Sequence, residues 1–156
     1  MTDVPELIRA LLSPLIAAGL LSRRDASVFV LSGPAQGVSR VDGLTRDRVA
    51  AMLPGSLRLH VTTLPGASAQ GFVVCAHVFI HDGSAERDVA AAYREAHGAD
   101  EGIRLLGSRP GRPDEAGPPG APARHALAWE LDTDSSLLVV TLARLSAGGD
   151  APLQYR

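Results

Sequence analysis

Apolar residues recur every three or four positions at the beginning of the chain, and this spacing predicts an amphipathic helix over residues 3–21. Asp3 suits the N-cap position, and Glu6 three residues later completes a capping-box pattern. Pro14 should kink the helix, because its ring removes one hydrogen bond and crowds the preceding turn. Gly19 suits the end of the helix, since glycine readily adopts the conformation that closes one. The chain therefore begins with a helix whose apolar side must pack against another element.

Strict alternation of apolar and polar residues over 57–63 predicts a strand with one buried side. Residues 72–81 are apolar on both sides, which is typical of a strand at the centre of a sheet. The remaining patterns predict four further strands, over 27–31, 103–106, 125–132 and 137–145. They also predict a helix over 45–53 and a helix over 84–97. Ser84 should cap the second of these helices, and its inward-facing residues should be Val89, Ala92, Tyr93 and Ala96. This order predicts an α+β fold, in which a mixed, mostly antiparallel sheet carries helices on one face.

The length of 156 residues suits one domain, residues 1–156, with an ordinary core. Residues 108–124 are rich in Pro and Gly and match no regular element. Because long loops without secondary structure are uncommon in compact domains and are often mobile or functional, we expect a mobile loop there.

Composition excludes several classes of function. The formal net charge is −2 and clusters of arginine are small, so we expect no nucleic-acid partner. All 15 basic residues are Arg, which leaves no lysine for a Schiff base or a phosphate-binding loop. The single Cys75 excludes an internal disulfide and a multi-cysteine zinc site. No apolar run is long enough to cross a membrane and no secretory signal pattern begins the chain, so we expect no membrane association and a cytoplasmic location.

Three segments, in order and at matching spacing, resemble the second domain of the N-acetyl-γ-glutamyl-phosphate reductases. They are residues 4–33, which include Leu-Leu-Ser-Pro-Leu-Ile-Ala-Ala-Gly-Leu-Leu; residues 59–97, which include Gln70-Gly71 and Ala-Ala-Tyr-Arg-Glu-Ala-His; and residues 137–148. The resemblance implies the catalytic and dimerisation domain of an NADP-dependent semialdehyde dehydrogenase of arginine biosynthesis. It also implies that the exposed face of the sheet is buried against another subunit.

The chain departs from that family at the positions that the resemblance makes catalytic. Asp3 stands where the family has its nucleophilic cysteine, and the segment that would carry the base-supplying histidines, residues 40–59, has none. Gln70 replaces an arginine that would hold the substrate carboxylate, and no glycine-rich dinucleotide fingerprint is present. We therefore expect no catalytic residue, no cofactor and no reductase activity.

Some residues could still carry chemistry. Cys75 and His77 share one side of a predicted strand, and His60 lies on the polar side of another. Such residues could form a nucleophile and its base, or metal ligands together with His81. The simpler interpretation is a half-buried strand surface at a sheet or dimer contact, because a free cysteine usually behaves as a small apolar residue. Gln70 and Gly71 remain binding candidates, and we expect no metal.

The sequence favours a non-catalytic homologue of the semialdehyde dehydrogenase dimerisation domain, which acts by homo- or hetero-association. One alternative is a subunit that completes or regulates a full-length reductase. Another is a small-molecule or metal binder that uses His60, Cys75 and His77. We expect a symmetric homodimer that buries the helix-free face of the sheet. We expect Val73, Cys75, His77 and Phe79 on that face, rather than the alternate set, because interfaces accept polar residues more readily than cores do.

Overall fold

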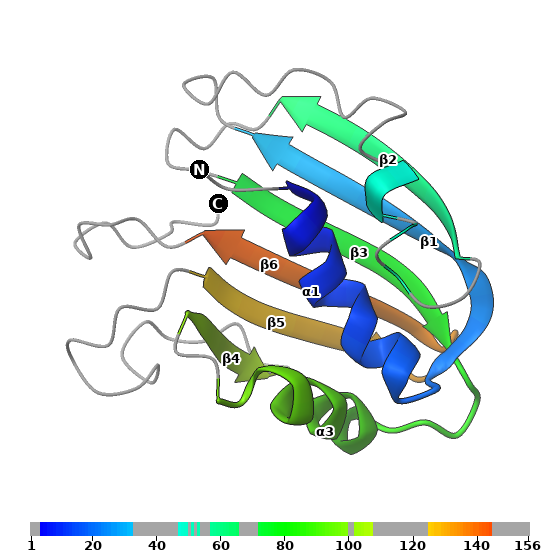
Figure 1. Cartoon of the computed structure of the whole chain (residues 1–156). Coiled ribbons are helices and arrows are strands. Elements are labelled where there is room, and N and C mark those ends of the chain that lie inside the picture. Colours follow the sequence, from blue (N-terminus) through cyan, green and yellow to red (C-terminus); the bar gives the residue numbers. More distant parts are fainter. Residues whose placement is uncertain are drawn as a thin grey trace.

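The structure is a computed structural model, and it describes residues 4–32, 47–49, 51, 53, 57–65, 72–99, 102–107 and 125–144. In chain order the elements are α1 (Val4–Ala17), β1 (Leu21–Ser32), β2 (Arg58–Pro65), β3 (Phe72–Ile80), α3 (Glu86–His97), β4 (Ile103–Gly107), β5 (His125–Asp132) and β6 (Leu137–Arg144) (Figure 1). Of the helix expected over 45–53, residues 47–49 and 51 are helical. Asp3, Gln70, Gly71 and the expected loop over 108–124 lie outside the described residues.

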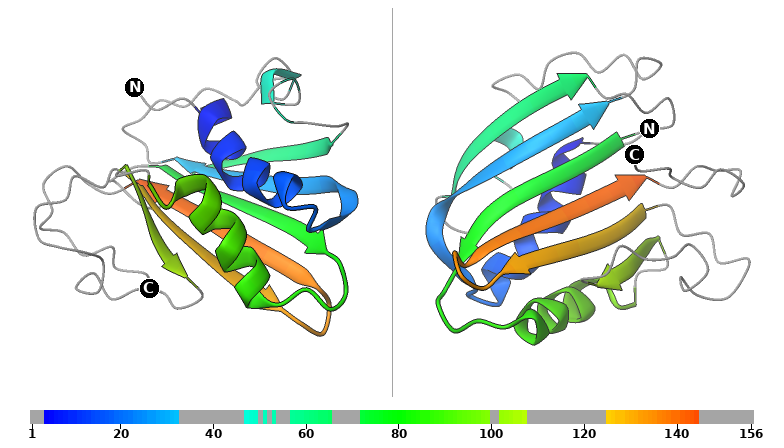
Figure 2. Two further views of the ribbon diagram at one scale, coloured as in Figure 1. Left: turned by 60° about the horizontal axis from the view of Figure 1, so that its bottom comes forward. Right: turned by 180° about the vertical axis from the view of Figure 1, so that it is seen from behind.

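The strands form one six-stranded sheet in the order β2-β1-β3-β6-β5-β4. The two outer pairs, β2 with β1 and β5 with β4, are parallel, and the three inner pairs are antiparallel. Helices α1 and α3 lie together on one face, and no described helix covers the other, as the view from behind shows (Figure 2). The predicted α+β fold with a mixed sheet and helices on one face is therefore confirmed.

Helix α1 ends at Ala17, earlier than the predicted residue 21, and Gly19 closes it as the sequence predicts. The Leu20 N–H donates to the Leu15 carbonyl at 3.0 Å and the Gly19 N–H donates to the Ile16 carbonyl at 3.0 Å, which is a Schellman closure. The φ angle of Gly19 is +68°, in the left-handed region that glycine adopts without strain.

Helix α3 begins one residue later than expected. Ala85, not Ser84, is the N-cap, and its backbone N–H donates to the Asp88 carboxylate at 2.8 Å. Ser84 instead donates its backbone N–H to the carbonyl of His81, because it belongs to the turn that follows β3. The expectation that Ala96 faces inward is also wrong, since Ala96 is exposed. The buried side of α3 includes Val89, Ala90, Ala92 and Tyr93, and it continues to the half-buried His97.

Helix α3 completes the hydrogen bonding of α1 around Pro14, through which α1 continues. Proline has no N–H, so it cannot donate to the carbonyl four residues earlier, that of Ala10. His97 Nε2 lies 2.8 Å from this oxygen, and a carbonyl can only accept, so Nε2 is the donor. One turn earlier in α3, the Tyr93 hydroxyl donates to the carbonyl of Leu11 at 2.6 Å.

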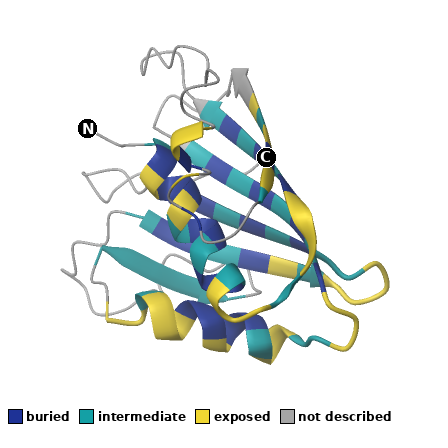
Figure 3. Cartoon of the chain, turned by 45° about the vertical axis from the view of Figure 1, so that its right-hand side comes forward, coloured by how far each residue is buried: buried dark blue, intermediate teal, exposed yellow. Residues whose placement is uncertain are grey.

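The core lies between the helices and the sheet. The even-numbered residues of β3, from Val74 to Ile80, are buried there, and Tyr93 stacks on Trp129 of β5 with ring centroids 5.4 Å apart. Figure 3 shows the same alternation of buried and half-buried residues along β3 and most of β6, the two strands at the middle of the sheet. Strand β1 is longer than the predicted 27–31, because residues 22–25 extend it with exposed polar side chains and an irregular register.

Candidate functional site

The helix-free side of the sheet, which we call the open face, carries the candidate residues. The odd-numbered residues of β3 from Val73 to Phe79 are half-buried, whereas the even-numbered ones are buried under the helices. The predicted orientation of this strand is therefore confirmed. Neighbouring strands contribute Phe29, Leu137 and Val139, which are half-buried as well.

The strand register arranges the open face in rows that cross the sheet. One row consists of His60, Ser27, His77, Val139 and Glu130, on β2, β1, β3, β6 and β5. The next consists of Thr62, Phe29, Cys75, Thr141 and Ala128 on the same five strands. Apolar side chains predominate in the middle of the open face, and the ionisable residues His60 and Glu130 lie toward its two sides.

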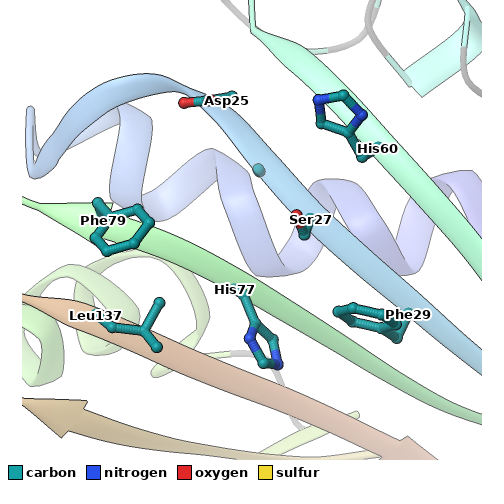
Figure 4. A pocket seen from close by; sticks show the side chains of 8 residues that line it. Asp25, Ser27, Phe29, His60, His77, Phe79 and Leu137 are labelled. Atoms are coloured by element: carbon teal, nitrogen blue, oxygen red, sulfur yellow. The ribbon is translucent and has the colours of Figure 1, made fainter.

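A shallow hollow of about 290 Å³ lies on the open face over β1. It is lined by Asp25, Ala26, Ser27, Phe29, His60, His77, Phe79 and Leu137. Figure 4 shows the imidazoles of His60 and His77 on either side of β1, with Ser27 between them. The His77 ring meets the Phe29 ring edge-on, with centroids 5.2 Å apart. The hollow thus offers imidazole and hydroxyl groups against a partly aromatic wall.

Arg23 borders this hollow. Its guanidinium carbon lies 4.2 Å from the centroid of the Phe79 ring, within the range of a cation–π contact. Arg23 itself is exposed. Because Phe79 lines the hollow, a fixed positive charge stands at its rim.

Cys75 lies one row away from the hollow and does not line it. Its Sγ accepts a weak hydrogen bond from the Thr141 hydroxyl at 3.7 Å. Burial raises the pKa of the Cys75 thiol, and the Thr141 hydrogen bond opposes this only in part. A protonated thiol is a poor nucleophile, and the described hydrogen bond of Cys75 Sγ is to Thr141 and not to His77, so these contacts do not pair the thiol with an imidazole base.

The metal-site alternative gains no support from the geometry. Within the part of the chain that the structure describes, no group of three or more His, Cys, Asp or Glu side chains could hold a metal ion. His81 is exposed just beyond the end of β3 and does not line the hollow with His60 and His77.

Sequence reasoning missed several residues of this site. Asp25 and Arg23 fall in the part of β1 that carries no alternating pattern, so nothing in the sequence placed them on the open face. Ser27 and Phe29 lie inside the predicted strand, but only the register brings them between His60 and His77.

No protein-family model matches the sequence. Several solved structures are similar in fold. Aspartate semialdehyde dehydrogenase II from Vibrio cholerae complexed with ASA has a TM-score of 0.62 and 12% identity over 89% of this chain and 49% of that chain. The fold is that of a semialdehyde dehydrogenase domain. A second structure of the Vibrio cholerae enzyme has a TM-score of 0.60 at 10% identity, and a probable aspartate-semialdehyde dehydrogenase from Pseudomonas aeruginosa has 0.54 at 14%.

The chain spans about half the length of these dehydrogenase chains, between 49% and 54%. The expected likeness to semialdehyde dehydrogenases is therefore confirmed at the level of fold. The narrower resemblance to N-acetyl-γ-glutamyl-phosphate reductases stays a prediction, since the three neighbours are aspartate-semialdehyde dehydrogenases. None of the described helices is both long and apolar enough to span a membrane.

Proposed function

We propose that this chain is a non-catalytic relative of the semialdehyde dehydrogenase dimerisation domain, and that it acts by forming a homodimer through the open face. One observation carries the proposal. The centre of the sheet presents half-buried apolar side chains, among them Phe29, Val73, Phe79 and Val139, on a face that no described helix covers.

The continuity of this apolar surface across the sheet supports association. Monomeric proteins rarely expose contiguous apolar patches of more than a few hundred Å², and larger ones usually mark interfaces. Here the apolar side chains come from four neighbouring strands, β1, β3, β6 and β5, so they form one continuous surface. The sequence resemblance implies that relatives bury the same face against a second subunit.

The chemistry of the described residues supports a non-catalytic role. Thiolate catalysis needs a cysteine with a lowered pKa, whereas burial raises the pKa of Cys75, the single cysteine of the chain. The sequence resemblance also implies that Asp3 stands at the family's nucleophile position, and Asp3 has no thiol.

A second candidate is hetero-association with a full-length semialdehyde dehydrogenase, such as an N-acetyl-γ-glutamyl-phosphate reductase of arginine biosynthesis. It is favoured by the fold likeness, because a shared sheet architecture would let the same open face pair with the matching domain of the larger protein. Co-purification of the two chains would distinguish it from homodimerisation.

The homodimer is tested by measuring the mass of the wild type and of Val139→Glu by size-exclusion chromatography with light scattering. Val139 is half-buried in the middle of the open face, so a carboxylate there would have to lose its hydration inside the interface. We expect a wild-type dimer and a folded Val139→Glu monomer, with folding checked by circular dichroism.

Two controls separate charge from other effects. Val139→Thr keeps the branched shape and strand preference without a charge, and should remain dimeric. Ala91→Glu adds the same charge at an exposed position of α3 and should also remain dimeric. A monomeric wild type at micromolar concentration would overturn the proposal.

A further inference from the structure

The ionisable side chains of the open face are distributed unevenly between its two sides. His60 of β2 and Arg23 of β1 lie on one side, and both are exposed. Asp25 and Arg58 lie on the same side as register partners, so their charges offset each other locally. The opposite side carries the exposed carboxylates of Glu130 and Asp132 on β5. Asp132 accepts hydrogen bonds from the Asp134 N–H and the Ser135 hydroxyl in the turn that follows β5.

Glu130 belongs to the same row as the hollow, but it cannot reach the hollow of its own chain. The row runs from His60 through Ser27, His77 and Val139 to Glu130. Three strand spacings separate Ser27 from Glu130, which is about 14 Å at ~4.8 Å per spacing. A glutamate side chain that stands on the sheet does not span this distance. The Glu130 carboxylate therefore makes no contact with the hollow of its own chain, although the hollow offers hydrogen-bond donors that suit a carboxylate.

A twofold axis along the strands, midway between β3 and β6, would bring Glu130 of one copy to the hollow of the other. This axis preserves the position along the strands and reverses the strand order β2-β1-β3-β6-β5-β4. Each row of one copy then faces the same row of the other, with β5 over β1. Glu130 of the second copy therefore lies over Ser27, between His60 and His77.

We propose that the hollow is the docking site for Glu130 of a second copy of this chain, which fixes the dimer axis along the strand direction. This inference rests on the proposed homodimer. Sheets that pack face to face lie about 10 Å apart, so side chains from both copies fill the space between them. The hollow's volume of about 290 Å³ accommodates a glutamate side chain.

The groups around the hollow suit a carboxylate. The Ser27 hydroxyl and the imidazoles of His60 and His77 can donate hydrogen bonds, and the Arg23 guanidinium lies at the rim against Phe79. Asp25 is the one unfavourable neighbour among the lining residues. The same axis brings Asp132 of the second copy near Asp25, and Arg58, the register partner of Asp25, supplies a positive charge beside these two carboxylates.

The other face-to-face twofold axis, perpendicular to the strands, does not produce this contact. It places each strand over its own copy, so Glu130 faces β5 of the partner and the hollow faces β1. Complementary groups then remain apart. Of these two axes, only the one along the strands brings Glu130 to the hollow.

The test exchanges the two members of the contact. Glu130→Lys places a cation beside the imidazoles and Arg23, and should raise the dimer dissociation constant about tenfold or more, as expected for a disrupted charge contact at an interface. His60→Glu places a carboxylate against Glu130 of the partner and should weaken the dimer similarly. The double variant His60→Glu/Glu130→Lys restores attraction across the axis, and its dissociation constant should return to within about threefold of the wild type.

Analytical ultracentrifugation of the full chain measures all four dissociation constants. Glu95→Lys, the same substitution at an exposed position of α3, is the matched control and should leave the constant unchanged. Two results with a dimeric wild type would overturn this contact and leave the proposed homodimer standing. In the first, Glu130→Lys leaves the dissociation constant unchanged. In the second, the double variant dimerises as weakly as the two single effects added together. A monomeric wild type overturns both.

Discussion

The hydrogen bond from His97 to the Ala10 carbonyl should matter because of Pro14. Without the proline, the backbone N–H of residue 14 would donate to Ala10 within α1. With it, the His97 imidazole supplies the missing donor at 2.8 Å from the other helix. His97 also stacks on Tyr93, with ring centroids 6.2 Å apart.

His97→Leu removes the donor and keeps much of the side-chain volume. It leaves a partly buried carbonyl without this partner, which costs about 1–3 kcal/mol of unfolding free energy. For a domain of 156 residues this corresponds to a fall in melting temperature of roughly 2–4 °C per kcal/mol. In a Pro14→Ala background the backbone N–H returns, so the same substitution should cost about 1 kcal/mol less.

The assay is a double-mutant cycle of urea unfolding at one protein concentration. The single Trp129 is buried against Tyr93, so its fluorescence reports the loss of the α3–sheet packing. His97→Gln retains an N–H donor on a flexible side chain and should recover part of the loss. An equal cost of His97→Leu in the wild-type and Pro14→Ala backgrounds would refute the reasoning, because the effect would then come from packing alone.

Two further predictions follow from the same region. Gly19→Ala should lower the unfolding free energy by about 1 kcal/mol, as measured by thermal unfolding. No atom lies within 4 Å of the added Cβ, so the cost comes from the φ angle of +68°. An unchanged stability would contradict this strain argument. Burial raises the pKa of Tyr93 well above 10, so this group contributes stability that is present below pH 10 and is lost as the pH rises beyond it. The unfolding free energy of the wild type should therefore fall by about 1.4 kcal/mol per pH unit above pH 10 because of this residue. The unfolding free energy of Tyr93→Phe should fall much less steeply. Parallel pH profiles for the two proteins would show that the ionisation of Tyr93 is not linked to folding.

Local pattern determined most of the elements of this fold. Alternation over 57–63 predicted a strand with one buried side, and the doubly apolar run over 72–81 predicted a central strand, because side chains alternate between the two faces of a strand. The outer position of the first of these strands came only from the structure. The preference of polar residues for an interface also predicted which side of β3 faces away from the helices. The first half of β1 was missed because its exposed side chains carry no apolar alternation.

The candidate site was predicted only as a set of residue types. His60, Cys75 and His77 were recognised because imidazole and thiol groups carry chemistry, but the hollow includes the two histidines without the cysteine and adds Asp25, Ser27 and Phe29. Which residues lie opposite each other depends on the register between strands far apart in the chain. A shift of one residue would turn every side chain to the other face, and neither neighbouring strand can set the register by its own sequence.

The start of α3 and the bonding of α1 illustrate the same division. The sequence placed a capping residue within one position, but the choice of Ala85 over Ser84 came from the turn that Ser84 completes after β3. The sequence also predicted that Pro14 removes a hydrogen bond from α1. Only the packing of the two helices decided that His97, 87 residues from Ala10, supplies the replacement, because a long-range hydrogen bond is specified by the position of whole elements and not by the residues around either end.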